Sequence, residues 1–198
     1  MTGSRFSTPT PSGRSRPTRR ASASLRVRTA TPEDVAPLTD LAERSFVAAF
    51  GSDNDSDDVR RYVADAFSHD RIATELTAVG SWFLLAHDHD DPGGPAVGYA
   101  RLLRGDHDLV GGHRPIQLVR LYVAPERIGR GGGGALMAAC LDHAARLGCD
   151  RMWLGVWEHN TRAQRFYRRW GFRRVGDQSF VLGGDAQTDH VMVRPVAG

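Results

Sequence analysis

The sequence lacks lysine altogether, so all 26 of its basic residues are arginine. This absence excludes the P-loop nucleotide-binding site, which contacts phosphate through a lysine. The two cysteines, Cys140 and Cys149, are too few for a disulfide framework, and the chain has no CxxC pair to suggest zinc or redox chemistry. No apolar run approaches the length of about 18 residues that a membrane span needs, so we expect no membrane segment. Few cysteines also favour a reduced, cytoplasmic setting.

Charge is distributed unevenly along the 198 residues. Residues 1–24 contain five arginines and no acid, whereas the remainder carries 21 arginines against 23 aspartates and glutamates, a formal charge of −2. The net charge of +3 therefore comes from a basic segment attached to a nearly neutral body. A nucleic-acid-binding domain would carry its positive charge on a folded face, so we expect no nucleic-acid partner.

Residues 1–24 are rich in Ser, Thr, Pro and Arg and have few large apolar side chains. Such a segment cannot bury enough surface to offset its ordering entropy, so we expect a disordered tail. It has no apolar stretch like that of a secretory signal. Its composition loosely fits an organelle transit peptide, but a solvated extension is the simpler interpretation. Residues 25–198 then form one folded domain, as the length suggests.

The hydrophobic pattern of residues 25–198 alternates between strand and helix signals. It predicts strands at 25–28, 81–87, 96–103, 116–123, 151–157, 172–182 and 189–196. It predicts helices after Thr31 up to residue 50, at 59–67, at 135–147 and from a capping box formed by Thr161 and Gln164. Strands 81–87 and 96–103 are expected to form a hairpin. This order predicts an α/β fold in which helices cover a mixed sheet.

The most informative segment is glycine-rich and lies between a predicted strand and a predicted helix: Arg127-Ile128-Gly129-Arg130-Gly131-Gly132-Gly133-Gly134. Glycine permits positive φ and lets a ligand approach the backbone closely. Because backbone N–H groups at a helix N-terminus bind anions, this segment is a candidate cradle for phosphate or pyrophosphate. Its spacing also satisfies the dinucleotide fingerprint. However, residues 124–128 separate the glycines from the strand, whereas the dinucleotide motif turns directly from strand to glycine.

The segment LYVAPERIGRGGGGALM, residues 121–137, resembles the acetyl-CoA-binding motif of the GCN5-related N-acetyltransferase (GNAT) superfamily. Ile128 stands where that motif usually has Gln or Arg, which leaves Arg127 and Arg130 to supply positive charge. A second segment, from Asn160 to Phe172, resembles the superfamily signature Asn-x-x-Ala-x-x-hydrophobic-Tyr followed by Gly-Phe. Both motifs occur in the usual order and at the usual separation.

The resemblance implies a single-domain GNAT fold over residues 25–198, with a mostly antiparallel mixed sheet, two splayed central parallel strands and helices on both faces. It implies an acetyl-CoA-dependent N-acetyltransferase in which an amine attacks the thioester directly in a ternary complex. The segments VWEHN, FYRRWGF and SFVLGGDAQTDHVMVRP also resemble the PaiA-type bacterial polyamine N-acetyltransferases. A polyamine or another small-molecule amine is therefore the expected acceptor. Protein N-termini, amino acids and aminoglycosides stay open as acceptors, and a homodimer stays open as well.

The resemblance also assigns roles to individual residues. The backbone of Leu121, Tyr122 and Val123 is expected to hold the pantetheine arm of the cofactor, and residues 127–134 its pyrophosphate. Asn160 would contact the same arm, although a helix-capping role is the simpler alternative. Tyr167 matches the tyrosine that often protonates the departing sulfur, with a purely structural role on its apolar helix stripe as the alternative.

Other candidates have weaker support from the sequence. Glu158 is the candidate general base or water organiser because it ends a splayed strand, and a solvated loop acid is the alternative. Gln117 and Tyr122 are further candidates for organising water. Phe46, Phe50 and Tyr62 could wall an acceptor pocket, although helix core explains them as well. The acids at 53, 55, 57 and 58 could attract a cationic amine or simply be solvated.

Two further functions stay open at this point, and a metal site is not expected. The segment 87–91, His-Asp-His-Asp-Asp, has a metal-like composition but falls in a predicted turn with no distant ligands to complete a site. Within the expected fold, the alternative is a CoA-binding regulatory module without turnover. Outside it, the alternative is a dinucleotide-binding oxidoreductase.

Overall fold

The computed structural model describes residues 25–51, 56–91, 93–182 and 185–196, so the predicted tail at 1–24 lies outside the described residues. Its elements follow one another in the order β1 (Leu25–Thr29), α1 (Val35–Phe50), α2 (Ser56–Ala66), α3 (His69–Thr77), β2 (Ser81–Asp88), β3 (Gly98–Arg104), β4 (Pro115–Val123), α4 (Gly132–Arg146), β5 (Arg151–Trp157), α5 (Thr161–Arg169), β6 (Arg173–Leu182) and β7 (Asp185–Pro195). The strands form one sheet in the order β1-β2-β3-β4-β5-β7-β6. None of the helices in the described ranges is long and apolar enough to cross a membrane.

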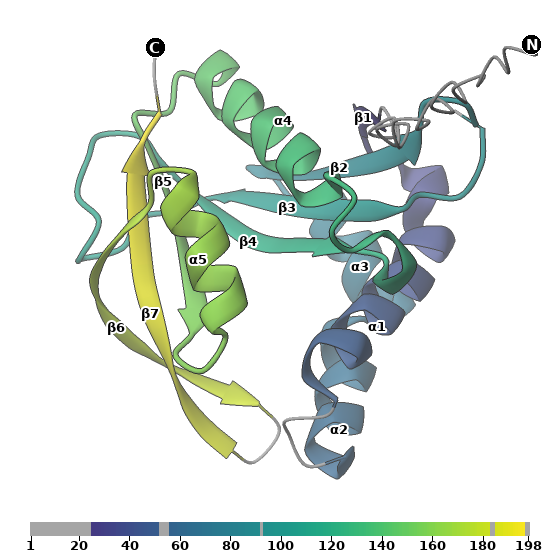
Figure 1. The fold of residues 1–198 in the computed structure, drawn as a ribbon, viewed down its shortest axis with the longest axis horizontal. Coiled ribbons are helices and arrows are strands. Elements are labelled where there is room, and N and C mark those ends of the chain that lie inside the picture. The colour runs from purple at the N-terminus through teal and green to yellow at the C-terminus, as the bar shows by residue number, and fades with distance from the viewer. Residues whose placement is uncertain (1–24, 52–55, 92, 183–184, 197–198) are drawn as a thin grey trace, which may run out of the picture.

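The sheet is antiparallel except at its centre, where β4 and β5 run parallel. Figure 1 shows α4 and α5 on one face of this sheet and α1, α2 and α3 on the other. Two cores result. Leu136, Met137 and Cys140 of α4 pack on the first face, and Leu38, Leu41 and other apolar residues of α1–α3 pack on the second. The predicted α/β architecture and the β2–β3 hairpin are thereby confirmed.

The two parallel strands separate soon after they meet. Residues Pro115–Gln117 of β4 pair with Arg151–Trp153 of β5, and no pairing between the two strands follows beyond Gln117 and Trp153. On its other side, β4 has a register shift against β3, because Arg120 pairs with Arg101 and Leu118 with Leu102. Val119 is therefore the extra residue of a β-bulge, which bends a strand and strengthens its twist. The bulge and the early end of pairing open the expected gap between β4 and β5.

Several predicted boundaries are wrong, and α3 is missing from the prediction altogether. Ser68 caps α3 by accepting a hydrogen bond from the Arg71 N–H, and Ile72 is fully buried. Helix α2 begins at Ser56 rather than at residue 59, within the predicted acidic loop. Strand β7 begins at Asp185 rather than at residue 189, because the β6–β7 ladder continues to the Leu182–Asp185 pair.

Helices α4 and α5 also begin differently from the prediction. Helix α4 starts at Gly132, so three of the glycines belong to the helix itself. Helix α5 is capped by Asn160, whose side-chain oxygen accepts from the Ala163 N–H at 3.0 Å, and not by Thr161. The buried Gln164 side chain instead donates to the carbonyls of Trp157 and Glu158. The predicted capping box is therefore wrong, because Gln164 ties α5 to the end of β5.

Candidate active site

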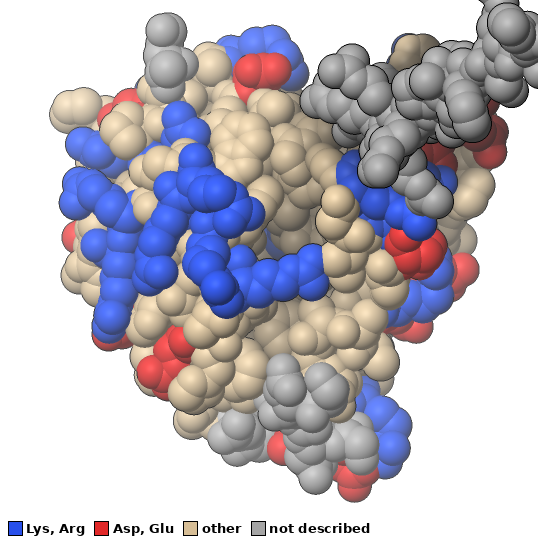
Figure 2. Space-filling model, viewed as in Figure 1, with Lys and Arg blue, Asp and Glu red and all other residues tan. Residues whose placement is uncertain are grey.

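The gap between β4 and β5 opens into two cavities that share part of their walls. The larger cavity has a volume of about 650 Å³ and lies toward the glycine segment, and the smaller has about 260 Å³ and lies toward α2 and β6. Residues common to both walls are Ala49, Leu121, Trp157, Asn160, Ala163 and Tyr167. Figure 2 shows a hollow on this face of the molecule with arginine side chains gathered over one side of it. The two cavities therefore meet at the splayed strands.

The glycine segment lines the larger cavity at the N-terminus of α4. Gly131 precedes the helix with φ of 89°, and Gly129 has φ of 80°, a region that side chains with a Cβ rarely adopt. The first hydrogen bond of α4 runs from the Ala135 N–H to the Gly131 carbonyl. The N–H groups of the preceding helical residues consequently have no intrahelical acceptor. Such a terminus binds phosphate through its N–H groups and its dipole.

Packing explains one of the glycines as well. A Cβ at Gly132 would lie 3.1 Å from the Val123 Cγ1, so this glycine lets the start of α4 approach β4 closely. A Cβ at Gly133 would meet the Phe166 ring at 3.6 Å and the Leu121 Cδ2 at 3.9 Å, which are ordinary contact distances. Gly132 therefore has a packing role in addition to its place in the predicted cradle.

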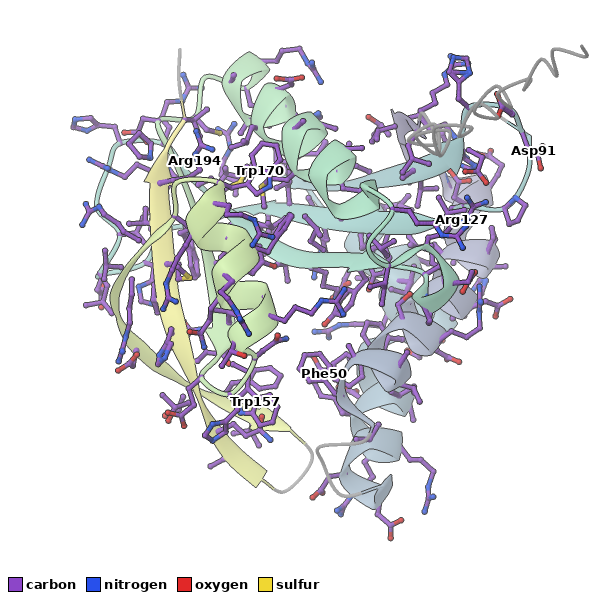
Figure 3. The ribbon with its side chains drawn as sticks, viewed as in Figure 1. Phe50, Asp91, Arg127, Trp157, Trp170 and Arg194 are labelled. Atoms are coloured by element: carbon purple, nitrogen blue, oxygen red, sulfur yellow. The ribbon has the colours of Figure 1, made fainter. Side chains whose placement is uncertain are left out.

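The positive charge around the larger cavity differs from the expectation. Arg127 lines it, but its guanidinium pairs with the Asp88 carboxylate, and Figure 3 shows Arg127 near the loop that leads into α4. Ile128 also lines the wall, whereas Arg130 does not. Arg162 and Arg169 of α5 do line it. Neither of them was assigned a role from the sequence, because nothing in the glycine motif points to α5.

Ser45 adds a polar group to the wall of the larger cavity. Its side chain on α1 is only 3% exposed, and its hydroxyl has no hydrogen-bond partner within the described part of the chain. Buried hydroxyls nearly always have a partner, so this one calls for a ligand or a water molecule. Ser45 was assigned no role from the sequence.

Strand β4 contributes its free edge to both cavities. Leu121 lines both, Val123 the larger and Tyr122 the smaller. The Tyr122 ring stacks on Tyr99 at 5.7 Å, and burial raises the pKa of Tyr122 well above its usual value. Because this part of β4 has no ladder partner on the β5 side, its backbone groups there are available to a ligand.

Tyr167 and Asn160 stand where the two cavities join. The Tyr167 ring contacts Phe166 and Phe172, with centroids 5.4 and 5.7 Å away. Its hydroxyl has no hydrogen-bond partner among the described residues, and burial raises its pKa well above the usual range. Tyr167 is therefore protonated at neutral pH and able to donate. Asn160 caps α5 and also lines both cavities, so its two expected roles are compatible.

Aromatic side chains form much of the wall of the smaller cavity. Phe46, Phe50 and Tyr62, the candidates for an acceptor pocket, line it together with Phe180 of β6. The Tyr62 ring lies 4.8 Å from the Phe46 ring and 5.7 Å from the Phe180 ring. Phe50 and Trp157 face each other at 6.2 Å across the gap between α1 and β5 (Figure 3).

The acids lie elsewhere than expected. Glu158 is exposed and belongs to neither wall, so its side chain is not positioned as a base in either cavity. Asp57 and Asp58 of α2 pair with Arg60 and Arg61 and also lie outside both walls. Residues 53 and 55 lie outside the described residues. Within the described ranges no three His, Cys, Asp or Glu side chains cluster as metal ligands would.

The carboxylate that does line the smaller cavity belongs to Asp189 of β7. Partial burial raises its pKa to about 6, against the opposing effects of His190 and of a hydrogen bond from Gln178. The sequence prediction named this residue only as part of the Gln-Thr-Asp resemblance and gave it no role. The site thus has an anion-binding helix terminus in one cavity, an aromatic pocket with one carboxylate in the other, and a protonated tyrosine between them.

Comparisons with known proteins agree with this geometry. The model of the acetyltransferase (GNAT) family matches residues 37–172. An uncharacterised N-acetyltransferase of Mycobacterium tuberculosis is 38% identical over 161 residues, which cover 81% of this chain and 97% of that protein. The spermine/spermidine N(1)-acetyltransferase of Bacillus subtilis is 32% identical over 89 residues, 44% of this chain and 59% of that protein.

A solved structure shares the fold. The PaiA N-acetyltransferase of Thermoplasma acidophilum, crystallised with coenzyme A, superposes with a TM-score of 0.68 at 18% identity, covering 87% of this chain and 99% of that chain. The family match spans most of the domain, from α1 to the end of α5. The chain therefore belongs to the GNAT family of acetyltransferases, whose acyl donor is acetyl-CoA.

Proposed function

We propose that this chain transfers the acetyl group of acetyl-CoA to the amine of a small molecule. The observation that carries the proposal is the junction of the two cavities at the splayed strands, which gives each of two substrates its own entrance to one point. Holding two reactants together in this way contributes up to roughly 7–11 kcal/mol in favourable cases.

The larger cavity suits the donor. Residues 129–134 and the α4 N-terminus would hold the pyrophosphate, and Arg162 and Arg169 would add positive charge beside it. The free edge of β4 at Leu121–Val123 would bind the pantetheine arm and donate a hydrogen bond to the thioester oxygen as negative charge develops there. Tyr167, which stays protonated, would donate a proton to the departing sulfur.

The smaller cavity suits the acceptor. Its aromatic wall and its single described carboxylate fit an amine better than an anion. A polyamine is the acceptor class that the PaiA-type resemblance favours, and the partial match to the Bacillus spermine/spermidine acetyltransferase adds support. A cytoplasmic location and a homodimer stay predictions.

Calorimetric titration and a thiol assay test the proposal. We expect acetyl-CoA to bind and to raise the stability of the protein by about 2.7 kcal/mol at 100 times its Kd. Adding a panel of amines should then release free CoA thiol. Binding of acetyl-CoA without thiol release for any amine would favour the regulatory module. Binding of NADPH in its place would favour the oxidoreductase.

A further inference from the structure

We propose that Asp189 binds the ammonium group of the acceptor and removes its proton, and that the acceptor therefore has one cationic amine on an apolar body. This inference rests on the proposed function and names the base and the substrate class for it. It starts from the one carboxylate in the wall of the smaller cavity as described.

The sheet leaves space for Asp189 at the place where β5 carries a glycine. Asp189 of β7 pairs with Trp157 of β5 and with Gln178 of β6. A Cβ at Gly155 would lie 2.8 Å from the Asp189 Oδ2 and 2.6 Å from the Gln178 Nε2. Any larger residue at 155 would displace both side chains. Gly155, Gln178 and Asp189 all line the smaller cavity, so the Asp189–Gln178 pair lies beside Gly155 in the wall of the expected acceptor pocket.

A chain of hydrogen bonds through His107 and Gln178 fixes the position of the Asp189 carboxylate. The Leu109 N–H donates to the His107 Nδ1 at 3.2 Å, so the neutral His107 ring carries its proton on Nε2. That Nε2 lies 3.1 Å from the Gln178 Oε1 and donates to it. The Gln178 amide is thereby oriented with its NH₂ group toward Asp189, to which it donates a hydrogen bond. His107 and Gln178 are positioning residues for the carboxylate.

Charged and titratable groups near Asp189 come from four elements. His190 follows it on β7, but its ring is bound to Asp177, 2.8 Å away. Tyr62 of α2 lines the same cavity; burial raises the Tyr62 pKa, and the negative charge of Asp189 contributes to this rise. Arg120 and Tyr122 of β4 line the same cavity, and Tyr167 of α5 closes it.

Arg120 lines the same wall but forms no ion pair with Asp189; it binds the buried Glu75 carboxylate, which Arg71 and Arg101 also contact. The Arg120 Nη1 lies 2.5 Å from the Glu75 Oε2, and its Nη2 donates to the Glu75 Oε1 and the Ala66 carbonyl. Its guanidinium also stacks over Phe67 at 5.0 Å. The ammonium of a substrate would supply Asp189 with the positive partner that the wall does not offer.

The same wall restricts the acceptor. Apart from Asp189, the described residues around the smaller cavity include several aromatic rings and neutral amides but no second acid: Phe46, Phe50, Tyr62, Phe67, Trp157 and Phe180 with Gln117, Gln178 and Gln187. One carboxylate with ring faces accommodates one ammonium and an apolar remainder. A second or third ammonium of a polyamine would be desolvated without a partner, which costs several kcal/mol for an isolated charge. On this point the wall disfavours the polyamine that the family resemblance suggests, and a monoamine fits better.

The proton balance is complete without another reactant. The acceptor enters as an ammonium ion, and Asp189 takes one proton and passes it to water. The neutral nitrogen attacks the thioester carbon, a C–N bond forms, and the C–S bond breaks. Tyr167 donates its hydroxyl proton to the thiolate. The nitrogen then loses its second proton, which returns the Tyr167 hydroxyl to its protonated form. The products are an amide, the free thiol of CoA and one proton in solution.

The test combines three variants with a pH profile. We expect kcat/KM for 2-phenylethylamine to exceed that for spermidine by at least about tenfold, and Asp189→Asn to lower it by roughly 10²–10⁴-fold, the range for a lost general base. The wild-type profile should fall below about pH 6. Gln178→Leu removes a bond that lowers the Asp189 pKa, so the acidic limb should move to higher pH. Gly155→Ala should reduce kcat/KM through displaced side chains.

Asp177→Asn is the matched control, because Asp177 and its partner His190 form the neighbouring cross-strand pair, whose side chains point to the other side of the sheet. Its kcat/KM should stay within about twofold of wild type. Wild-type thiol release that survives Asp189→Asn with an unchanged pH profile overturns the role of Asp189 and leaves acetyl transfer standing. A preference for spermidine overturns the substrate class. No thiol release by the wild type with any amine overturns the proposed function itself.

Discussion

Among single residues, Tyr167 is the one at which a chemical role and a structural role predict the most different results. Tyr167→Phe keeps the ring contacts with Phe166 and Phe172 and removes a hydroxyl that no described group binds. We expect stability to change by about 1 kcal/mol or less. If the hydroxyl protonates the sulfur, the single-turnover rate should fall roughly 10²–10⁴-fold while acetyl-CoA affinity stays unchanged.

The measurement must isolate chemistry from product release, which can limit kcat in the wild type. Rapid-quench single-turnover experiments at saturating acetyl-CoA do this, and circular dichroism checks the fold. A Phe variant that is well folded and reacts at the wild-type single-turnover rate would return Tyr167 to the core.

Asp189 should weaken the fold wherever it is ionised. Its pKa is about 6 in the folded protein against 3.8 as a free side chain, so the folded state holds this proton more tightly than the unfolded state does. Stability from this group is therefore fully present below about pH 4 and is lost as the pH rises through 6. We expect Asp189→Asn to raise the unfolding free energy at pH 8 by about 1–2 kcal/mol, a value discounted for partial exposure.

Urea unfolding of the variant and the wild type at pH 4 and pH 8 provides the measurement. The gain should shrink toward pH 4, where both side chains are neutral. An equal difference at both pH values would mean that packing, and not the buried charge, separates the two proteins.

At the scale of elements, the start of α4 joins backbone conformation to ligand binding. Gly131→Ala places a Cβ on a residue with φ of 89°, which costs about 1–2 kcal/mol. The strained turn should also shift the N–H groups of the first helical turn, so acetyl-CoA affinity should fall at least about tenfold. Titration calorimetry at a temperature where both proteins are folded measures this directly.

Gly171 supplies the matched control for that experiment. It ends α5 with φ of 84°, a Cβ there would meet nothing within 4 Å, and it lies outside both cavities. Gly171→Ala should lose a similar amount of stability and keep its affinity for acetyl-CoA. Equal losses of affinity in the two variants would show that strain alone, and not the cradle, weakens binding.

Elements with a long, regular hydrophobic pattern could be predicted from the sequence, and those that depend on tertiary contacts could not. The sixteen residues of α1 carry four turns of apolar spacing, whereas the nine residues of α3 carry little more than Ile72 and Leu76 after the Ser68 cap. Helix α4 begins within a run of glycines, poor helix formers, because the close approach of Gly132 to Val123 stabilises that turn.

At the scale of the whole molecule, part of the wall of the larger cavity was predictable, because the β4 edge and the glycine segment form one contiguous motif, whereas Ser45 and Arg162 come from other helices. In the smaller cavity only a few residues such as Phe46, Phe50 and Tyr62 could be named in advance, because β4, β5, β6, β7, α1, α2 and α5 all contribute to its wall. Asp189 gives no local signal, since its importance depends on Gly155 and Gln178, both distant in sequence. Ser45 likewise looks like one more small residue on a buried helix stripe. Glu158 looked more suitable because it ends a splayed strand, but its side chain is exposed.

The junction between β4 and β5, here called the seam of the sheet, affects how the sheet can deform. Three residue pairs of parallel ladder, Pro115–Gln117 with Arg151–Trp153, link the four-stranded half β1–β4 to the three-stranded half β5–β7. A small shear or twist between the two halves therefore strains few hydrogen bonds, and the short ladder allows the halves to move slightly relative to each other. A molecule lying along the open part of the seam would bond to both edges and act as a missing strand. Each catalytic cycle would then stiffen the sheet when the donor enters and soften it when the product leaves.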